Sequence, residues 1–190
     1  MNETIQAIID DLRLENVNTA QLEKIAAVDH RYIRELKLNI SAALRDKNLT
    51  KKEIYLVALS IASNERNQTL IDGFEKLAKE EEATDEEIAE VHACTSLMNA
   101  NNIVYRFRHY LADEPKYTNA PLGLRMNIMM NPILGKELFE LISFTVSAVN
   151  DCEQCIKSHE NSVKKEGASE AKVFDAVRIA AVVKSLSVLI

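Results

Sequence analysis

The sequence lacks several features that define common classes of protein. It has no run of 18 apolar residues, so we expect no membrane-spanning helix. Its first residues lack a basic segment followed by an apolar one, so secretion is not expected. We expect a cytoplasmic location instead. The net charge is −6, from 23 basic and 29 acidic residues, without a sustained basic patch. Nucleic acid is therefore not an expected partner.

Cysteine and histidine are also scarce, with three and four residues in 190. Three of these seven nevertheless fall within eight positions, in Cys152-Glu-Gln-Cys155-Ile-Lys-Ser-His159. Residues three and four apart are neighbours on a helix, so the three side chains share one stripe. Two thiols that can bridge, with a base beside one of them, are the minimum apparatus of dithiol–disulfide chemistry. The stripe predicts a redox centre whose disulfide is transient and catalytic, as suits a reducing cytosol.

The two thiols are expected to have different activators. Asn150 and Asp151 are good N-cap residues, which places Cys152 in the first turn of a helix. The helix dipole and the unpaired N–H groups there favour a thiolate and a lowered pKa. His159 is one turn from Cys155 and two turns from Cys152. Its proximity favours Cys155 as the attacking thiol, although this spacing leaves the order open.

Other uses of these cysteines fit less well. A closed zinc site needs four ligands, whereas this cluster supplies three at most and the sequence has no second Cys-x-x-Cys. A structural disulfide across four residues would constrain the unfolded chain very little. Cys94 stands alone on an apolar helical pattern, where a buried, inert thiol is expected. No bound metal or cofactor is expected.

A carboxylate precedes the pair by twelve residues, at Glu140 in an apolar helical segment. A break at Asn150-Asp151 would let two helices pack and turn Glu140 towards His159. A carboxylate that orients a histidine beside a thiol is the general nucleophile–base–orienter arrangement. From the residues alone, Glu140 is equally well interpreted as a surface residue.

Almost every segment has a helical period, and no period-two strand is convincing, so the fold class is predicted to be all-α. Thr50-Lys-Lys-Glu53 and Thr84-Asp-Glu-Glu87 are capping boxes that open apolar runs. The one loop-like stretch, 112–121, contains two of the three prolines. A second break is expected at Asn131-Pro132.

The loop separates two halves that resemble each other. The segment that begins at Glu53 can be laid over the segment that begins at Glu140, with the carboxylates matched. Glu65, Gln68 and Asp72 then take the places of the redox residues. We expect a single helical domain over 1–190, with a redox-inactive first repeat over 1–111 and a second repeat over 122–190 that carries the Cys-x-x-Cys site.

Glu140 followed by Cys152-x-x-Cys155-x-x-x-His159 resembles the signature of the alkyl hydroperoxidase D branch of the carboxymuconolactone decarboxylase superfamily. The segments Asn101-Asn-Ile-Val-Tyr-Arg-Phe-Arg108 and Gly123-Leu-Arg-Met-Asn127-Ile look like that family as well. The resemblance covers most of the chain and is strongest from about residue 95 to residue 166. It implies an all-helical fold of the alkylhydroperoxidase D-like type, built from two similar halves.

The resemblance also implies an activity, the reduction of organic hydroperoxides, with hydrogen peroxide or peroxynitrite as further candidate substrates. Cys155 would attack the peroxide, Cys152 would resolve the sulfenic acid, and Glu140 with His159 would relay protons. The electron donor would be an external dithiol of the dihydrolipoamide type, on the lipoylated acyltransferase of a 2-oxoacid dehydrogenase complex. The resemblance further implies a homotrimer or larger ring.

One position departs from the family pattern. Gln154 stands immediately before the second cysteine, where the best-known members of the family it resembles carry a histidine. A glutamine can orient water by hydrogen bonding but cannot take a proton near neutral pH. The departure puts the rate in doubt and supports an alternative function, a redox-sensing or disulfide-exchange protein with little peroxidase turnover.

Two further readings carry less weight. Lactone decarboxylation is suggested only by the superfamily name, and those decarboxylases lack the paired cysteines. Arg106, Arg108 and His109 are interpreted as a solvated or ion-paired helix face rather than as catalytic groups. His30 and His92 have no companion of catalytic type nearby in the sequence.

Overall fold

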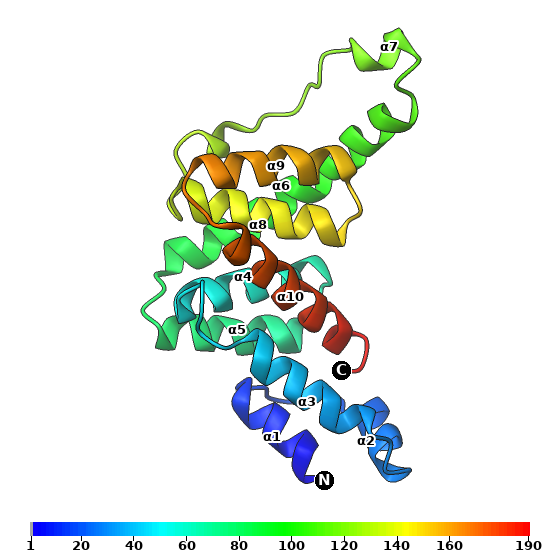
Figure 1. Ribbon diagram of the computed structural model, residues 1–190, viewed down its shortest axis with the longest axis vertical. Coiled ribbons are helices and arrows are strands. Elements are labelled where there is room, and N and C mark those ends of the chain that lie inside the picture. Colours follow the sequence, from blue (N-terminus) through cyan, green and yellow to red (C-terminus); the bar gives the residue numbers. More distant parts are fainter. Residues whose placement is uncertain (1) are drawn as a thin grey trace.

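A computed structural model describes residues 2–190, in which helices are the only regular elements (Figure 1). The all-α prediction is confirmed. The elements in chain order are α1 (Glu3–Asp11), α2 (Ala20–Ala27), α3 (Tyr32–Ala43), α4 (Lys51–Asn64), α5 (Gln68–Glu80), α6 (Asp85–Tyr110), α7 (Pro115–Thr118), the 3₁₀ helix η1 (Asn127–Met129), α8 (Lys136–Val149), α9 (Glu153–Lys165) and α10 (Glu170–Ser187).

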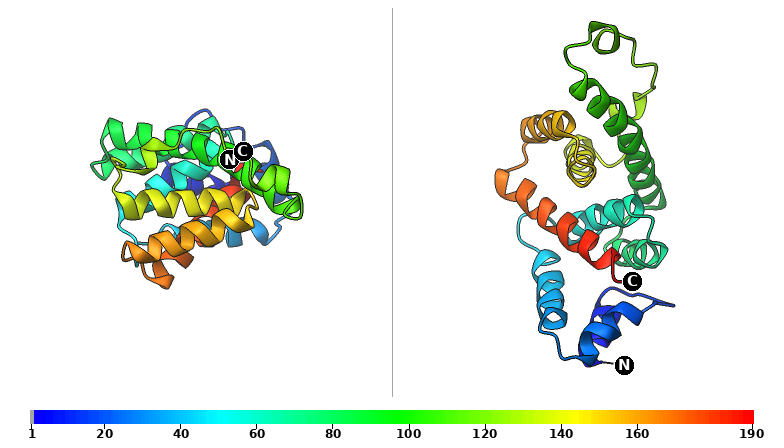
Figure 2. Two further views of the ribbon diagram at one scale, coloured as in Figure 1. Left: turned by 90° about the horizontal axis from the view of Figure 1, so that it is seen from above. Right: turned by 90° about the vertical axis from the view of Figure 1, so that its right-hand side faces the viewer.

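The helices form an elongated molecule with three parts along its length (Figure 1). Helices α1–α3 lie at the end that holds the N-terminus, and α4, α5 and α10 form the middle. Helices α6, α8 and α9 form the other end, where α8 packs against both α6 and α9. The long helix α6 extends beyond this bundle to α7, and residues 119–135 return along it (Figure 2). Within residues 2–190, no helix is both long and apolar enough to cross a membrane.

The core is densest around α4 and α8. Helix α8 is buried at every position from Leu138 to Ser147, as expected of a helix surrounded by others. Both predicted capping boxes form: the Thr50 and Thr84 hydroxyls accept from the third backbone N–H of their helices, and the matching glutamates accept in return. The sequence thus fixes where α4 and α6 begin, and their apolar faces fix where they pack.

The predicted loop at 112–121 is partly helical, because α7 forms a single turn with Pro115 at its first position, where a missing N–H costs nothing. The expected break at Asn131-Pro132 is present, since regular helix resumes only at Lys136. The stretch between these two segments contributes Met126 and Met129 to the pocket described below.

The two halves repeat with one constant spacing. Helices α4, α5 and α6 begin at Lys51, Gln68 and Asp85, and α8, α9 and α10 begin 85 residues later, at Lys136, Glu153 and Glu170. The left-handed residues follow the same spacing, with Arg66 matched by Asp151 and Glu82 by Gly167. The overlay of Glu53 on Glu140 is therefore two residues out of register. The division into repeats at 1–111 and 122–190 stays a prediction.

Candidate active site

The Cys-x-x-Cys pair lies at a sharp turn between α8 and α9. Helix α8 ends at Val149 and α9 begins at Glu153, so the break expected at Asn150-Asp151 is confirmed. Asp151 is left-handed, with φ of 56°, and reverses the chain. The sequence suggested Asn150 or Asp151 as the N-cap of α9, but the N-cap is Cys152. Asp151 is left-handed and therefore cannot hold the extended conformation of a cap residue.

Cys152 and Cys155 are joined by a disulfide. No side chain accepts a hydrogen bond from the first turn of α9, so the sulfur of Cys152 is the group placed at its N-cap. A thiolate at this position would face unpaired N–H groups and the positive end of the helix dipole. The two sulfurs differ in access: Cys155 is 5% exposed and Cys152 is fully buried.

The turn is held by a hydrogen-bonded group that sequence reasoning missed. Arg106 on α6 donates from Nη1 to the carbonyl oxygen of Asn150 at 2.8 Å. Asn150 donates from Nδ2 to Oδ1 of Asn102 at 3.0 Å, and Asn102 donates in turn to Ser147 Oγ at 2.9 Å. The predicted solvated or ion-paired face is wrong for Arg106, which is half-buried and bonds a backbone carbonyl. Its one sequence signal is the four-residue spacing from Asn102, which places both on one face of α6.

Glu140 and His159 form a buried pair. Glu140 Oε2 lies 2.7 Å from Nδ1 of His159, and each residue is 8% exposed. The turn at 150–152 folds α9 back onto α8 and so brings together two residues 19 positions apart. The surface interpretation of Glu140 is wrong. A carboxylate on Nδ1 fixes the ring orientation and favours the tautomer with Nε2 as the free base.

Cys155 and His159 line one pocket of about 350 Å³. It lies between α6, α9 and the segment around η1. Its lining is both polar and apolar and comprises Asn101, Tyr105, Met126, Met129, Gln154, Cys155, Ser158 and His159. A ligand here would meet a thiol and a base on one wall and two methionine side chains on another.

Cys94 is the third cysteine and lies apart from the pair. Its side chain is fully buried on α6, with Sγ 3.3 Å from Ser143 Oγ. Burial raises the pKa of this thiol to about 12, which suppresses the reactive thiolate at neutral pH. The expected burial of Cys94 is thus confirmed, and the raised pKa is what an inert thiol requires.

Comparison with known proteins identifies the family. A protein from Anaeromyxobacter dehalogenans strain 2CP-C, named alkyl hydroperoxide reductase AhpD, is 41% identical over 155 residues, which is 82% of each chain. Proteins of the same name from Coxiella burnetii strain Dugway 5J108-111 and Corynebacterium kroppenstedtii are 39% and 33% identical, each over 82% of this chain and 89% and 88% of their own. The chain belongs to the AhpD family.

The carboxymuconolactone decarboxylase family model also matches residues 115–187, a range that contains the whole α8–α9 pair. The resemblance read from the sequence is therefore confirmed. Membership of the AhpD family supports an oxidoreductase of the peroxidase type.

In this AhpD-family chain, Gln154 is exposed and lies beside His109 of α6. Gln154 Nε2 is 3.4 Å from His109 Nδ1, and His109 Nε2 is 3.3 Å from a carboxylate oxygen of Glu153. These side chains line a second pocket of about 150 Å³ at Cys152, together with Arg106 and others. The sequence interpretation did not place His109 near the cysteines.

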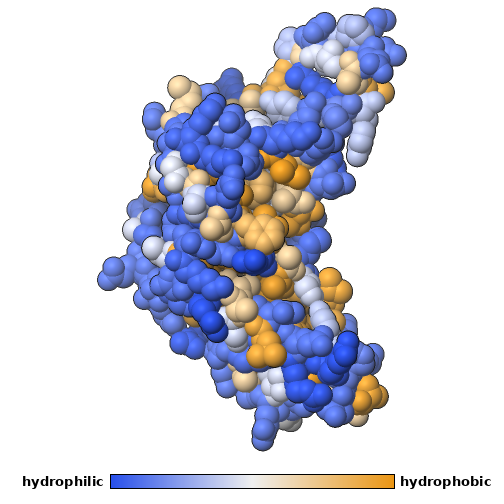
Figure 3. Space-filling model, in the orientation of Figure 1, coloured by the Kyte–Doolittle hydropathy of each residue, from blue (hydrophilic) through white to orange (hydrophobic). Residues whose placement is uncertain are grey.

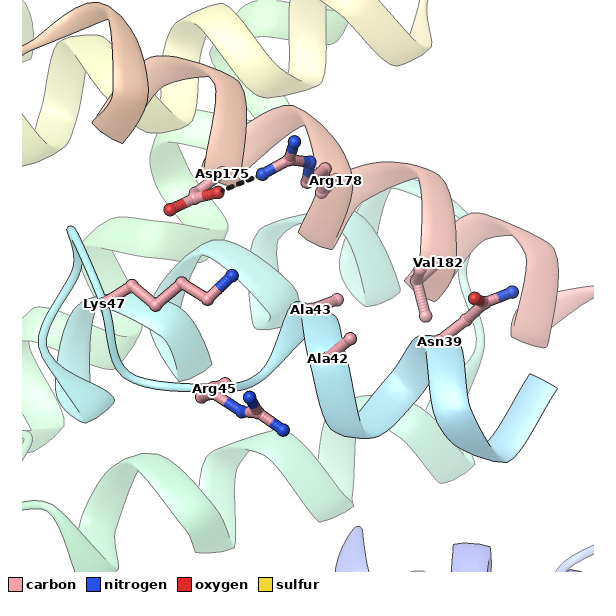
Figure 4. Close-up of a pocket in the computed structure, with 8 residues that line it drawn as sticks. All are labelled: Asn39, Ala42, Ala43, Arg45, Lys47, Asp175, Arg178 and Val182. Atoms are coloured by element: carbon pink, nitrogen blue, oxygen red, sulfur yellow. Dashed lines mark hydrogen bonds and ion pairs between the residues drawn. The ribbon is translucent and has the colours of Figure 1, made fainter. Parts of the chain in front are cut away.

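The remaining polar groups of the AhpD-family chain lie elsewhere. His92 bonds Ser63 Oγ at 2.9 Å and Glu75 at 2.8 Å, on the first half of the molecule. A pocket between α3 and α10 holds Arg45, Lys47 and Arg178, the last paired with Asp175 (Figure 4). It contains no predicted site residue. Across residues 2–190, no group of three or more His, Cys, Asp or Glu is placed to bind a metal.

Proposed function

We propose that this AhpD-family protein reduces organic hydroperoxides through a dithiol–disulfide cycle of Cys152 and Cys155. The observation that supports it most strongly is the pocket that Cys155 and His159 both line, where Glu140 bonds Nδ1 of the imidazole. The pocket thus combines a nucleophile and a base, and an orienting carboxylate behind the base, in a cavity that is large enough for a small organic substrate.

The oxidative half-reaction begins at Cys155. Its thiolate attacks the distal oxygen of the hydroperoxide, so an S–O bond forms and the O–O bond breaks. The departing alkoxide takes a proton from the imidazolium of His159, which has received it from the thiol, and leaves as an alcohol. Glu140 stabilises the imidazolium during the transfer.

Cys152 then completes the oxidation. Its sulfur attacks the sulfenic acid of Cys155, the disulfide forms, and hydroxide leaves to become water with the proton of the second thiol. The pair has thereby passed two electrons to the peroxide. Placement of Cys152 at the N-cap of α9 favours the thiolate that this step requires.

The donor we propose is an external dithiol of the dihydrolipoamide type, on the lipoylated acyltransferase of a 2-oxoacid dehydrogenase complex. The first donor sulfur attacks Cys155, the more exposed sulfur, and Cys152 leaves as a thiolate at the helix end. The second donor sulfur then releases the protein as the dithiol. The donor must therefore dock near the N-terminus of α9.

We further propose a homotrimer or larger ring. Eight large apolar residues are exposed within residues 103–133, on the outer part of α6, on α7 and on the segment that returns from it: Ile103, Phe107, Tyr110, Tyr117, Leu124, Ile128, Met130 and Ile133. So much apolar surface on one protruding segment favours burial by a second copy. Apolar groups also gather along the hollow edge of the molecule (Figure 3). Sedimentation analysis of the purified protein tests this assembly.

The decisive experiment measures hydroperoxide consumption with dihydrolipoamide as reductant, in the wild type and in Cys152→Ser and Cys155→Ser variants. Turnover that needs both cysteines supports the proposal. Oxidation of the pair by hydroperoxide without turnover would instead favour the redox-sensing or disulfide-exchange protein that Gln154 suggests. An unreactive pair would contradict both functions.

A further inference from the structure

Asn101 has an unused hydrogen-bond acceptor beside the redox pair. It lies on α6, is 4% exposed, and lines the pocket that Cys155 and His159 share. Its Oδ1 is the one buried side-chain nitrogen or oxygen, among those of residues 2–190, without a hydrogen-bond partner. Buried polar atoms are nearly always paired, so an unpaired acceptor at a pocket wall points to a ligand.

The neighbouring contacts define what kind of ligand Asn101 is suited to. Its Nδ2 donates to the sulfur of Met126 at 3.3 Å, a weak acceptor, so the free group of the amide is the carbonyl oxygen. The adjacent Asn102 differs, because its two ends are bonded to Ser147 and Asn150 in the turn before the cysteines. Asn102 thus has a structural partner at each end, whereas Asn101 presents an acceptor and needs a donor.

We propose that Asn101 Oδ1 binds the substrate by accepting a hydrogen bond from the O–O–H group of an alkyl hydroperoxide. This inference rests on the peroxidase function proposed above. A hydroperoxide has one donor, on its distal oxygen, which is the atom that a thiolate attacks. A bond from this O–H to Asn101 holds the distal oxygen in the cavity that Cys155 lines, and leaves the inner oxygen free to be protonated by His159.

The rest of the pocket fits the organic part of such a molecule. Met126 and Met129 come from the segment around η1, and Tyr105 lies one turn beyond Asn101 on α6. Methionine side chains adapt to apolar groups of different shape. The distal hydrogen stays on its oxygen as the sulfenic acid forms, so Asn101 orients the peroxide and transfers no proton.

The test separates peroxide binding from the reactivity of the thiol. The reduced protein is mixed with cumene hydroperoxide in a single turnover, and separately with N-ethylmaleimide, which has no hydrogen-bond donor. Asn101→Leu removes the acceptor, and we expect oxidation of Cys155 to slow about tenfold, the effect of one lost hydrogen bond. Its reaction with N-ethylmaleimide should change by less than about twofold, since the thiol itself is intact.

Asn102→Leu is the matched control. Loss of its bonds loosens the turn, so both reactions of Cys155 should change together and their ratio should stay near that of the wild type. If Asn101→Leu does not fold, Asn101→Ala gives the same comparison with a smaller side chain. An unchanged ratio in the Asn101 variants would overturn the inference and leave Oδ1 bonded to solvent. A wild type that hydroperoxide does not oxidise would overturn the proposed function first, and this inference with it.

Discussion

The helix pairs α4–α5 and α8–α9 share one backbone plan and carry different chemistry. Each pair has a 14-residue helix, a three-residue turn whose second residue is left-handed, and a 13-residue helix. With the spacing of 85 residues, the site positions Glu140, Cys152, Cys155 and His159 correspond to Tyr55, Asn67, Leu70 and Phe74.

In the first pair these positions serve packing and capping. Leu70 and Phe74 are almost fully buried in the core, and Asn67 caps α5 by accepting from the backbone N–H of Leu70. In the second pair, a bridged sulfur takes the cap position and a histidine bonded to a carboxylate takes the core position. The backbone therefore brings the four positions together, and the side chains alone decide whether the result is a core or a candidate redox site.

The largest expected difference is between the effects of substituting Cys155 and its counterpart Leu70 on turnover and on stability. Cys155→Ser should abolish peroxidase turnover, by more than about a thousandfold, because the attacking sulfur is lost, while the unfolding free energy of the reduced protein barely changes. Leu70→Ala should do the reverse. It leaves a cavity in the core and lowers the unfolding free energy by about 3 kcal/mol.

Peroxide assays and urea denaturation on both variants test this pair. If Leu70→Ala abolished turnover while the protein remained folded, the division of roles between the two halves would be wrong.

His159→Phe installs the residue of the first half at the base position. Turnover should slow about a hundredfold, because general acid–base assistance is lost, and its pH dependence should change. The buried Glu140 is also left without its partner, so Glu140→Gln in the same chain should restore part of the lost stability. Steady-state pH profiles and thermal unfolding of the single and double variants provide the measurement, and an unaltered profile in His159→Phe would argue against the proposed relay.

The sequence overlay matched Glu53 with Glu140, and the surroundings of the two carboxylates differ. Burial raises the pKa of Glu53, but hydrogen bonds from Lys172 and Thr50 outweigh it and hold the pKa below its ordinary value of 4.5. Lys172 also pairs with Glu137 and so connects α10 to both α4 and α8. Glu53 therefore has a structural role, unlike the one proposed for Glu140.

A depressed pKa in the folded state means that the contribution of Glu53 is present above pH 4.5 and lost as the pH falls through the folded value. Lys172→Met should cost about 1 to 2 kcal/mol near pH 7 and reduce the loss of stability on acidification. Urea midpoints between pH 3 and pH 7 measure this effect. Equal acid sensitivity in wild type and variant would show that the network contributes nothing.

Asn67 makes the side-chain cap of α5 that Cys152, its counterpart, does not make for α9. Asn67→Ala removes the side-chain acceptor for α5 and a 2.8 Å bond to the carbonyl of Ile190, and should lower the unfolding free energy by about 1 kcal/mol. Turnover should remain at the wild-type level, since Asn67 occupies the position of Cys152 without its sulfur. Chemical denaturation and a peroxide assay on one preparation suffice, and a large loss of turnover would contradict the expected separation.

The smallest expected effect is the reaction of Cys94 with a thiol reagent in the native protein. With its pKa raised to about 12 by burial, its thiolate fraction at pH 8 is negligible and grows only as the pH approaches that value. A thiol reagent should therefore label two cysteines in the reduced native protein and all three after unfolding. Mass spectrometry of the labelled protein counts them, and rapid native labelling of Cys94 would mean that the packing around α6 opens.

The sequence predicted the features that depend on near neighbours. Capping boxes at Thr50 and Thr84 are local hydrogen-bonding patterns, and both form. The break before Cys152 was predicted for the same reason, although its left-handed Asp151 and the cap at Cys152 were not. Matching Glu53 with Glu140 set the first part of the overlay two residues out of register, because a single polar identity carries less information than the spacing of turns.

The sequence by itself determined an all-helical chain and placed two cysteines and a histidine on one stripe of α9, because helical spacing is a property of residues close in the chain. Only the tertiary structure decided that Glu140 meets His159, that Arg106 fixes the turn, and that Asn101, a residue of the pocket wall, has an unpaired buried acceptor. Those contacts join residues on separate helices, and they depend on how buried faces pack, which no local pattern specifies.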